Sequence, residues 1–134
     1  MELKRVVVTG LGAVTPLGLN VDETWEALLN GVSGAGPITH FDASQFKTQF
    51  ACEVKNFDPT LYLDKKEVRK FDRYAQFAVA AAKEAVGDSA LDLEKVDKNR
   101  VGVIFAAGIG GIRTFEEEVG GYFTNIERGP KFNP

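Results

Sequence analysis

The stretch RVVVTGLGAVTPLG, residues 5–18, holds the first clear information about the fold. Three valines and a threonine, residues 6–9, form a β-branched run that ends at Gly10. A continuous apolar run of this kind is typical of a strand that is covered on both faces. We therefore predict a short buried strand here, followed by a glycine-rich turn.

A second stretch, RVGVIFAAGIGG at residues 100–111, repeats this arrangement. Its apolar part predicts a strand over residues 101–106, which again runs into glycines. The following RTFEEEVGGYF, residues 113–123, predicts a helix. Three glutamates at 116–118 lie near the start of that helix, where the helix dipole favours negative charge.

The segment after the opening turn predicts a short helix. Asn20 followed by Glu23 matches a capping box, in which each residue satisfies a backbone N–H of the other. Trp25, Leu28 and Leu29 then supply an apolar stripe. The helix is expected to end at residue 31, a glycine that can adopt the left-handed conformation.

The longest periodic segment runs from Asp64 to Val86. Asp64 and Glu67 match a second capping box. Apolar residues recur at helical spacing along one face, at Val68, Phe71, Ala75, Ala78, Ala82 and Ala85. We predict a central packed helix that is bent near Phe71 and is terminated by Gly87, Asp88 and Ser89. Its alanine-rich second half lets another backbone approach closely.

Between these helices, residues 32–62 are irregular and predict loops with at most short strands, one of them around residues 50–54. The order is then strand, helix, irregular stretch, helix, strand, helix. This alternation predicts an α/β protein with a mainly parallel sheet. The sequence stops at RGPKFNP, where nothing closes a sheet, so we expect residues 1–134 to form an incomplete part of a larger domain.

The composition excludes several classes of protein. The 134 residues are 44% hydrophobic and 26% charged with a net charge of −3, so no general basicity indicates nucleic-acid binding. No apolar run approaches the roughly 20 residues of a membrane span. One cysteine and one histidine are too few for a disulfide framework or a structural zinc site. We expect a cytoplasmic, soluble protein without a metal or another cofactor.

The opening glycines also invite comparison with a dinucleotide-binding loop. That motif needs three glycines that open directly into a helix. Gly10 and Gly12 fit, but Thr15 occupies the third position, Pro16 follows it, and the first helix start is Asn20. The stretch therefore favours a turn after a strand, and a nucleotide-binding module remains the disfavoured alternative.

Two residues are of types that often take part in catalysis. Cys52 could be a nucleophile, but it lies in a predicted strand beside Glu53, whose negative charge disfavours a thiolate. We interpret it as a small, half-buried side chain. His40 could be a general base near Asp42, but it has no nucleophile partner, which favours a structural role.

A group of basic residues is a stronger signal. Four of them follow the spacing i, i+3, i+4, i+7 and so share one helix face, with a fifth beside them: Lys66, Arg69, Lys70 and Arg73, with Lys65. In an acidic protein this face is either simply solvated or a docking surface for an anionic partner.

Four stretches, taken in order, resemble one family: RVVVTGLGAVTPLG, TWEALLNGVSGAGPITHFDAS, DKKEVRKFDRYAQFA and RVGVIFAAGIGG. The chain resembles the start of the β-ketoacyl-acyl carrier protein synthases, the elongating condensing enzymes of bacterial type II fatty acid synthesis. The synthase II branch is the most similar, because AGIGGI keeps the bulky Ile109 between its glycines. Polyketide ketosynthases and chain-length factors share these motifs and remain an alternative.

The resemblance implies a thiolase-like fold of α-β-α-β-α layers, a homodimer, and decarboxylative condensation of an acyl-enzyme with malonyl-acyl carrier protein. The family's catalytic cysteine and two histidines lie beyond Pro134, so no catalytic residue is expected in this chain. By the same resemblance, Lys65, Lys66, Arg69, Lys70 and Arg73 match the docking surface for the acyl carrier protein. Ile109 matches a residue of the acyl pocket, and Phe132 lies near another segment of that pocket. No cofactor, nucleic acid or membrane is implied.

Overall fold

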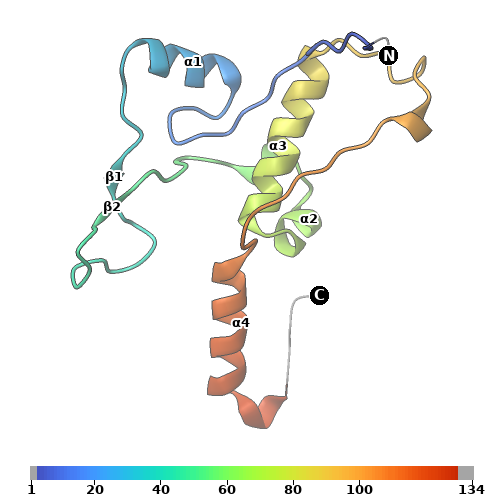
Figure 1. Ribbon diagram of the computed structural model, residues 1–134. Coiled ribbons are helices and arrows are strands. Elements are labelled where there is room, and N and C mark those ends of the chain that lie inside the picture. The colour runs from blue at the N-terminus through green and yellow to red at the C-terminus, as the bar shows by residue number, and fades with distance from the viewer. Residues whose placement is uncertain (1–2, 130–134) are drawn as a thin grey trace. The chain divides into compact units, whose positions relative to one another are not determined.

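The computed structural model describes residues 3–129. These residues form the α-helices α1 (Val21–Leu29), α2 (Lys65–Lys70), α3 (Arg73–Asp88) and α4 (Ile112–Thr124), which are labelled in Figure 1. Two short strands, β1 (Gly36–Pro37) and β2 (Phe50–Ala51), pair in antiparallel fashion. Three 3₁₀ turns complete the set: η1 (Pro59–Leu61), η2 (Lys98–Arg100) and η3 (Ile126–Arg128).

The chain divides into two compact units. One consists of Met1–Asp58 with Ala80–Asp92, and the other of Pro59–Val79 with Leu93–Pro134. The first holds α1 and the β1–β2 hairpin, and the second holds α2 and α4. The boundary falls within α3, between residues 79 and 80.

Local signals form α1 as predicted. The Asn20 side chain accepts a hydrogen bond from the Glu23 backbone N–H at 2.8 Å. The Glu23 carboxylate accepts from the N–H of Leu19 at 2.7 Å, one residue earlier than a capping box requires. At the other end Gly31 has φ +65°, and the N–H of Val32 donates to the carbonyl of Ala27 at 2.9 Å. These bonds satisfy the last carbonyls of the helix.

The single helix predicted over residues 64–86 is two helices. Phe71 has φ −89° and ψ 130°, an extended conformation that ends α2 at Lys70, and α3 begins at Arg73. The predicted bend is therefore a complete break. α3 ends at Asp88, within the three residues that were predicted to terminate it.

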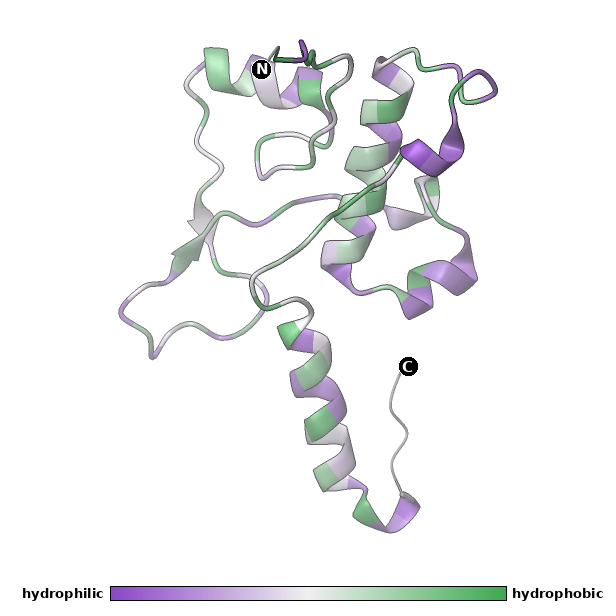
Figure 2. Cartoon of the chain, turned by 45° about the vertical axis from the view of Figure 1, so that its right-hand side comes forward, coloured by the Kyte–Doolittle hydropathy of each residue, from purple (hydrophilic) through white to green (hydrophobic). Residues whose placement is uncertain are grey.

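The two predicted buried strands are not formed. Residues 6–9 and 101–106 have no strand pairing, and β1 with β2 is the only sheet among the described residues. Val6 is 90% exposed and Ile104 is 97% exposed; Figure 2 colours much of residues 101–106 as hydrophobic. A strand is completed by hydrogen bonds from a neighbouring strand, and no described segment supplies them. For the same reason, residues 3–129 do not form the predicted mainly parallel sheet.

The predicted close approach to the alanine-rich half of α3 is confirmed. A Cβ on Gly10 would overlap the carbonyl oxygen of Ala85, and one on Gly12 would overlap that of Ala81. Only glycine lets the opening loop lie directly against the backbone of α3. Among the described residues, no helix is long and apolar enough to cross a membrane.

Candidate functional site: a basic helix and a glycine turn

Helix α2 is short, and its first turn is fixed by a complete capping box. The Asp64 carboxylate accepts from the N–H groups of Lys66 and Glu67 at 2.7 and 2.8 Å. The Glu67 carboxylate accepts in return from the Asp64 N–H at 3.1 Å. Arg69 and Lys70 occupy the last turn, where the helix dipole favours positive charge. Asp64 and Glu67 at the start, and Arg69 and Lys70 at the end, thus have the sign of charge that stabilises a helix, whereas Lys65 and Lys66 in the first turn do not.

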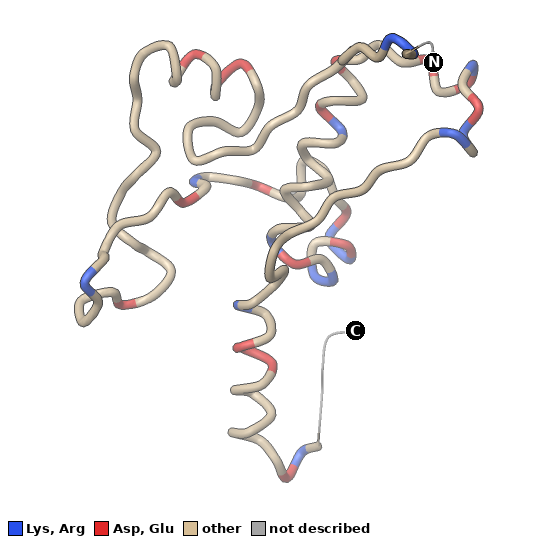
Figure 3. The backbone as a smooth tube through the Cα atoms, viewed as in Figure 1, with Lys and Arg blue, Asp and Glu red and all other residues tan. Residues whose placement is uncertain are grey.

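Basic residues follow one another closely on this helix and at the first residue of the next, and Figure 3 colours the backbone of those on α2 blue. We call this set the basic face: Lys65, Lys66, Arg69, Lys70 and Arg73, all of them exposed. The prediction that four of them share one helix is wrong for Arg73, because the break at Phe71 moves it to α3. The Arg73 guanidinium lies 5.1 Å from the centre of the Phe77 ring, over its face.

A buried amide holds α2 against α3. Gln76 is the only buried polar residue among those described, with 6% of its surface exposed. Its Nε2 donates to the carbonyls of Val68 and Phe71 at 3.0 and 2.9 Å. Carbonyls at the end of a helix have no partner within it, so Gln76 both satisfies them and positions the basic face.

Ile109 lies on the glycine turn, residues 108–111, immediately before α4. Gly110 has φ +75°, a conformation that favours glycine. Ile109 is 79% exposed, and it is not among the residues that line the pocket at the C-terminal end of α4. The second residue predicted for the acyl pocket, Phe132, lies outside the described residues. Both assignments stay predictions.

The side chain of Asp72 connects the starts of two helices and was missed by sequence reasoning. Its Oδ1 accepts from the Tyr74 N–H at 3.2 Å, at the start of α3. Its Oδ2 accepts from the hydroxyl of Thr114, in the first turn of α4. An aspartate just before a helix is an N-cap signal, which was available in the sequence. The contact with a residue 42 positions away was not.

Two backbone donors of the opening loop, which lies in the other unit, are bound to carboxylates. The N–H of Leu11 donates to the Asp88 carboxylate at 2.8 Å, and that of Ala13 donates to Glu84 at 2.8 Å. The second oxygen of Glu84 accepts from the Val21 N–H at 2.8 Å. A phosphate needs such N–H donors and is repelled by carboxylates. The loop therefore has the wrong electrostatics for a nucleotide.

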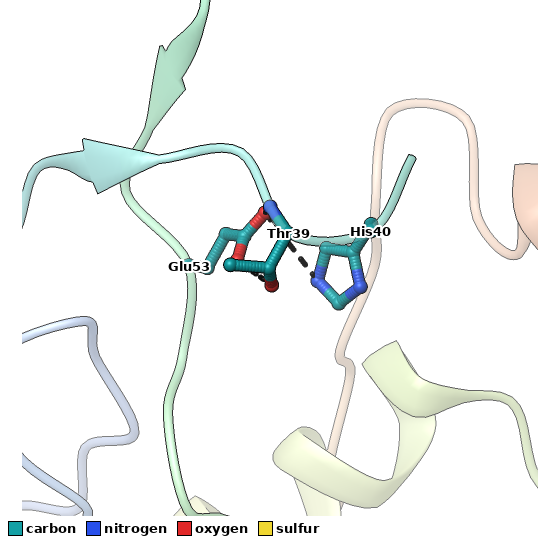
Figure 4. A network of polar contacts seen from close by, with 3 residues as sticks. All are labelled: Thr39, His40 and Glu53. Carbon is teal, nitrogen blue, oxygen red and sulfur yellow. Dashed lines mark hydrogen bonds and ion pairs between the residues drawn. The ribbon is translucent and has the colours of Figure 1, made fainter. Parts of the chain in front are cut away.

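Cys52 and His40 lie near the β1–β2 hairpin, without the partners that catalysis needs. Cys52 follows β2 and is exposed, so its half-buried interpretation was wrong. Figure 4 shows Glu53 accepting from the Thr39 N–H and hydroxyl, at 2.9 and 2.6 Å, with His40 Nε2 at 3.9 Å. The Thr39 bonds hold the pKa of Glu53 below its usual value. This arrangement ties the hairpin together.

The carboxylate of Asp42, the candidate partner of His40, binds the backbone of Ser44 instead. Its Oδ1 accepts from the Ser44 N–H at 3.0 Å, which lowers the pKa of Asp42 and forms a local turn. Within the part of the chain that the structure describes, no group of three or more acidic, cysteine or histidine side chains could hold a metal ion. The basic face and the glycine turn are the features that remain for function.

Comparison with known protein families identifies the family of this chain. The profile of the β-ketoacyl synthase N-terminal domain matches residues 3–128. The chain belongs to this family. It is 49% identical over 131 residues to the 3-oxoacyl-[acyl-carrier-protein] synthase 2 of Coxiella burnetii, covering 98% of this chain and 31% of that protein. The β-ketoacyl synthase segment thus spans less than a third of the length of this relative.

Solved ketosynthases share its fold. The ishigamide ketosynthase/chain length factor matches with a TM-score of 0.78 and 30% identity, over 88% of this chain and 29% of that one. A type II polyketide synthase acyl-carrier protein in complex with its ketosynthase, bound to the hexaketide, matches with a TM-score of 0.71 and 26% identity. That match covers 96% of this chain and 33% of the other. These likenesses support the expected ketosynthase-type, thiolase-like α/β fold.

Proposed function

We propose that this chain is the N-terminal part of a 3-oxoacyl-acyl carrier protein synthase of type II fatty acid synthesis. The whole enzyme transfers an acyl group to a cysteine and then condenses it with malonyl-acyl carrier protein, with loss of carbon dioxide. The acyl chain grows by two carbons. The observation that carries this proposal is the 49% identity to a 3-oxoacyl-[acyl-carrier-protein] synthase 2 along 98% of the chain.

The nucleophile and the two histidines of this reaction belong to the remainder of the synthase. Cys52 and His40 take no part in it: neither matches a catalytic position of the family, and His40 Nε2 lies 3.9 Å from the carboxylate of Glu53 in the hairpin contact. In the whole enzyme the segment completes a layered α-β-α-β-α arrangement, in which residues 6–9 and 101–106 gain neighbouring strands. The enzyme is a cytoplasmic homodimer that uses no cofactor.

The basic face is the docking surface for the acyl carrier protein. Five exposed basic side chains, on a segment anchored by Gln76, attract an acidic partner at long range and orient it on contact. A ketosynthase at 26% identity is known in complex with an acyl-carrier protein, which supports a carrier as the partner. Ile109 and Phe132 belong to the acyl pocket.

A polyketide ketosynthase or chain-length factor is the second candidate, favoured by the two structural likenesses. Their identities of 30% and 26% are well below 49%, which supports the fatty acid enzyme. The test is to supply the full-length protein with acyl- and malonyl-loaded carrier protein. We expect carbon dioxide and one 3-oxoacyl product that is longer by two carbons. Repeated extension without reduction would instead identify a polyketide enzyme, and no condensation would overturn both proposals.

A further inference from the structure

The glycine turn that carries Ile109 has little to hold it in place. Gly111 precedes α4 and makes no side-chain cap for it. Gly108 and Gly110 have no side chains, and Ile109 is 79% exposed. A turn of this kind has many accessible conformations unless another element fixes it. The position of Ile109 therefore depends on contacts from elsewhere in the same unit.

Asp72 supplies that contact. Its carboxylate lies against Gly111 so closely that a Cβ there would overlap Oδ2. The same Oδ2 accepts the hydroxyl of Thr114, so the carboxylate touches both the last residue of the glycine turn and the first turn of α4. Its negative charge at the start of α4 also complements the helix dipole. Asp72 thus links the first turn of α4, through the Thr114 hydroxyl, to the start of α3.

Asp72 is tied to the basic face through α3. Its Oδ1 caps α3 at the Tyr74 N–H, and Gln76, one turn along, donates to the end of α2. A Cβ on Gly110 would also lie 3.8 Å from the Tyr74 ring, in van der Waals contact. One short segment, residues 72–76, thus holds the end of α2 on one side and the glycine turn on the other.

We propose that Asp72 is a positioning residue for acyl-chain selection, because its bond to Thr114 fixes the glycine turn and so the place of Ile109. This inference rests on the proposed function, in which Ile109 belongs to the acyl pocket. Asp72 does not touch the acyl chain; it acts through the turn. Loss of the bond frees Ile109 and changes how strictly long and short acyl chains are distinguished.

The test uses the full-length synthase with hexanoyl- and myristoyl-carrier protein as primers. Asp72→Ser keeps an N-cap oxygen for α3 but is too short to reach Thr114 as well. Thr114→Val removes the donor and keeps the shape of the side chain. In both variants the ratio of the two kcat/KM values is expected to change by about five-fold or more, as for loss of a hydrogen bond to a charged group. The KM for malonyl-carrier protein stays at its wild-type value.

Three comparisons separate positioning from general destabilisation. Thr114→Ser retains the hydroxyl and is expected to restore the wild-type ratio. The double variant of Asp72 and Thr114 is expected to change the ratio no further than either single one, because both remove one bond. Asp97→Asn is the matched control: this carboxylate accepts from the Asn99 N–H at 3.0 Å, two residues along, in the same unit.

The outcomes distinguish the inference from the function on which it rests. If the wild-type enzyme condenses both primers and the ratio is unchanged in Asp72→Ser and Thr114→Val, the positioning role is wrong and the function stands. An equal loss for both primers, together with a lower Tm, assigns Asp72 to stability alone and also overturns the inference. If the wild-type enzyme condenses neither primer, the proposed function is wrong, and the inference that rests on it is wrong as well.

Discussion

Gly12 lies so close to Ala81 that a Cβ on the glycine would overlap the carbonyl oxygen of that alanine. The same Cβ would lie 2.8 Å from the backbone nitrogen of Ala85, so the obstruction is the backbone of α3 and cannot rotate away. The flanking N–H groups of Leu11 and Ala13 donate to carboxylates of the same helix. The opening glycines therefore allow the loop to pack directly against the backbone of α3, so their role is structural.

Gly12→Ala is expected to destabilise the full-length protein by about 1–3 kcal/mol or more, as overpacking against rigid atoms does. Urea unfolding followed by circular dichroism measures the change. Gly87→Ala is the control, since Gly87 lies in α3 of the same unit with nothing near the position of its Cβ. Alanine in a helix is favoured there by up to about 1 kcal/mol. Equal stability of both variants would contradict the close docking of the loop.

The elements that the sequence predicts correctly are those encoded by neighbouring residues. Asn20 and Asp64 cap the helices that follow them, and Gly31 adopts the left-handed conformation that ends α1. Each depends on contacts within about one helical turn, so short motifs suffice to predict it. The basic face was found by the same local spacing. Its error, the place of Arg73, came from treating a strong periodicity as one continuous helix.

The features that the sequence could not predict depend on distant residues. Residues 6–9 have the composition of a buried strand, but pairing needs a neighbour that composition does not specify. The bond between Asp72 and Thr114 joins positions 42 apart, and that between Glu84 and Ala13 joins positions 71 apart. Ile109 could be assigned to a pocket only through family resemblance, because the turn itself carries no chemical signal.

The hairpin contact between Thr39 and Glu53 gives a pH-dependent prediction. The pKa of Glu53 is below its ordinary value of 4.5, chiefly because the Thr39 hydroxyl and N–H donate to the carboxylate. A carboxyl with a lowered pKa stabilises the fold above its unfolded pKa, and this stabilisation is lost as the pH falls through the folded value. Thr39→Val should therefore lower stability near neutral pH and flatten its decline below about pH 4.5.

The measurement is the free energy of unfolding in urea across this acidic range, for wild type and variant. Thr48→Val is the control, since Thr48 is also exposed and lies between the same two strands. Its pH dependence is expected to match wild type. A Thr39 variant whose stability declines as steeply as wild type would show that the contact does not shift the pKa of Glu53.

Charge reversal on the basic face tests whether the acyl carrier protein docks there. The double variant Lys66→Glu, Arg69→Glu places two negative charges where an acidic carrier approaches, which slows association. We expect the KM for acyl-carrier protein to rise by roughly ten-fold at low salt, and by less near physiological salt because the field is screened. Stopped-flow binding and steady-state kinetics of the full-length enzyme measure both effects.

The matched control is Lys95→Glu with Lys98→Glu, which reverses the same number of exposed basic residues in the same unit, outside α2. Its KM for acyl-carrier protein is expected to remain near the wild-type value. If the two double variants behave alike, net charge rather than the basic face governs association. An unchanged KM in the variant of Lys66 and Arg69 would remove the docking role.

Enlarging the side chain of Ile109 tests its place at the end of the acyl pocket. In the whole synthase a phenylalanine there would overfill the space that the last carbons of a long chain occupy. Ile109→Phe is expected to lower kcat/KM for the longest primers by about ten-fold and to leave short primers unaffected. Ile109→Val, which is smaller, should accept every primer that the wild type accepts. Normal elongation of long chains by Ile109→Phe would place the end of the pocket elsewhere.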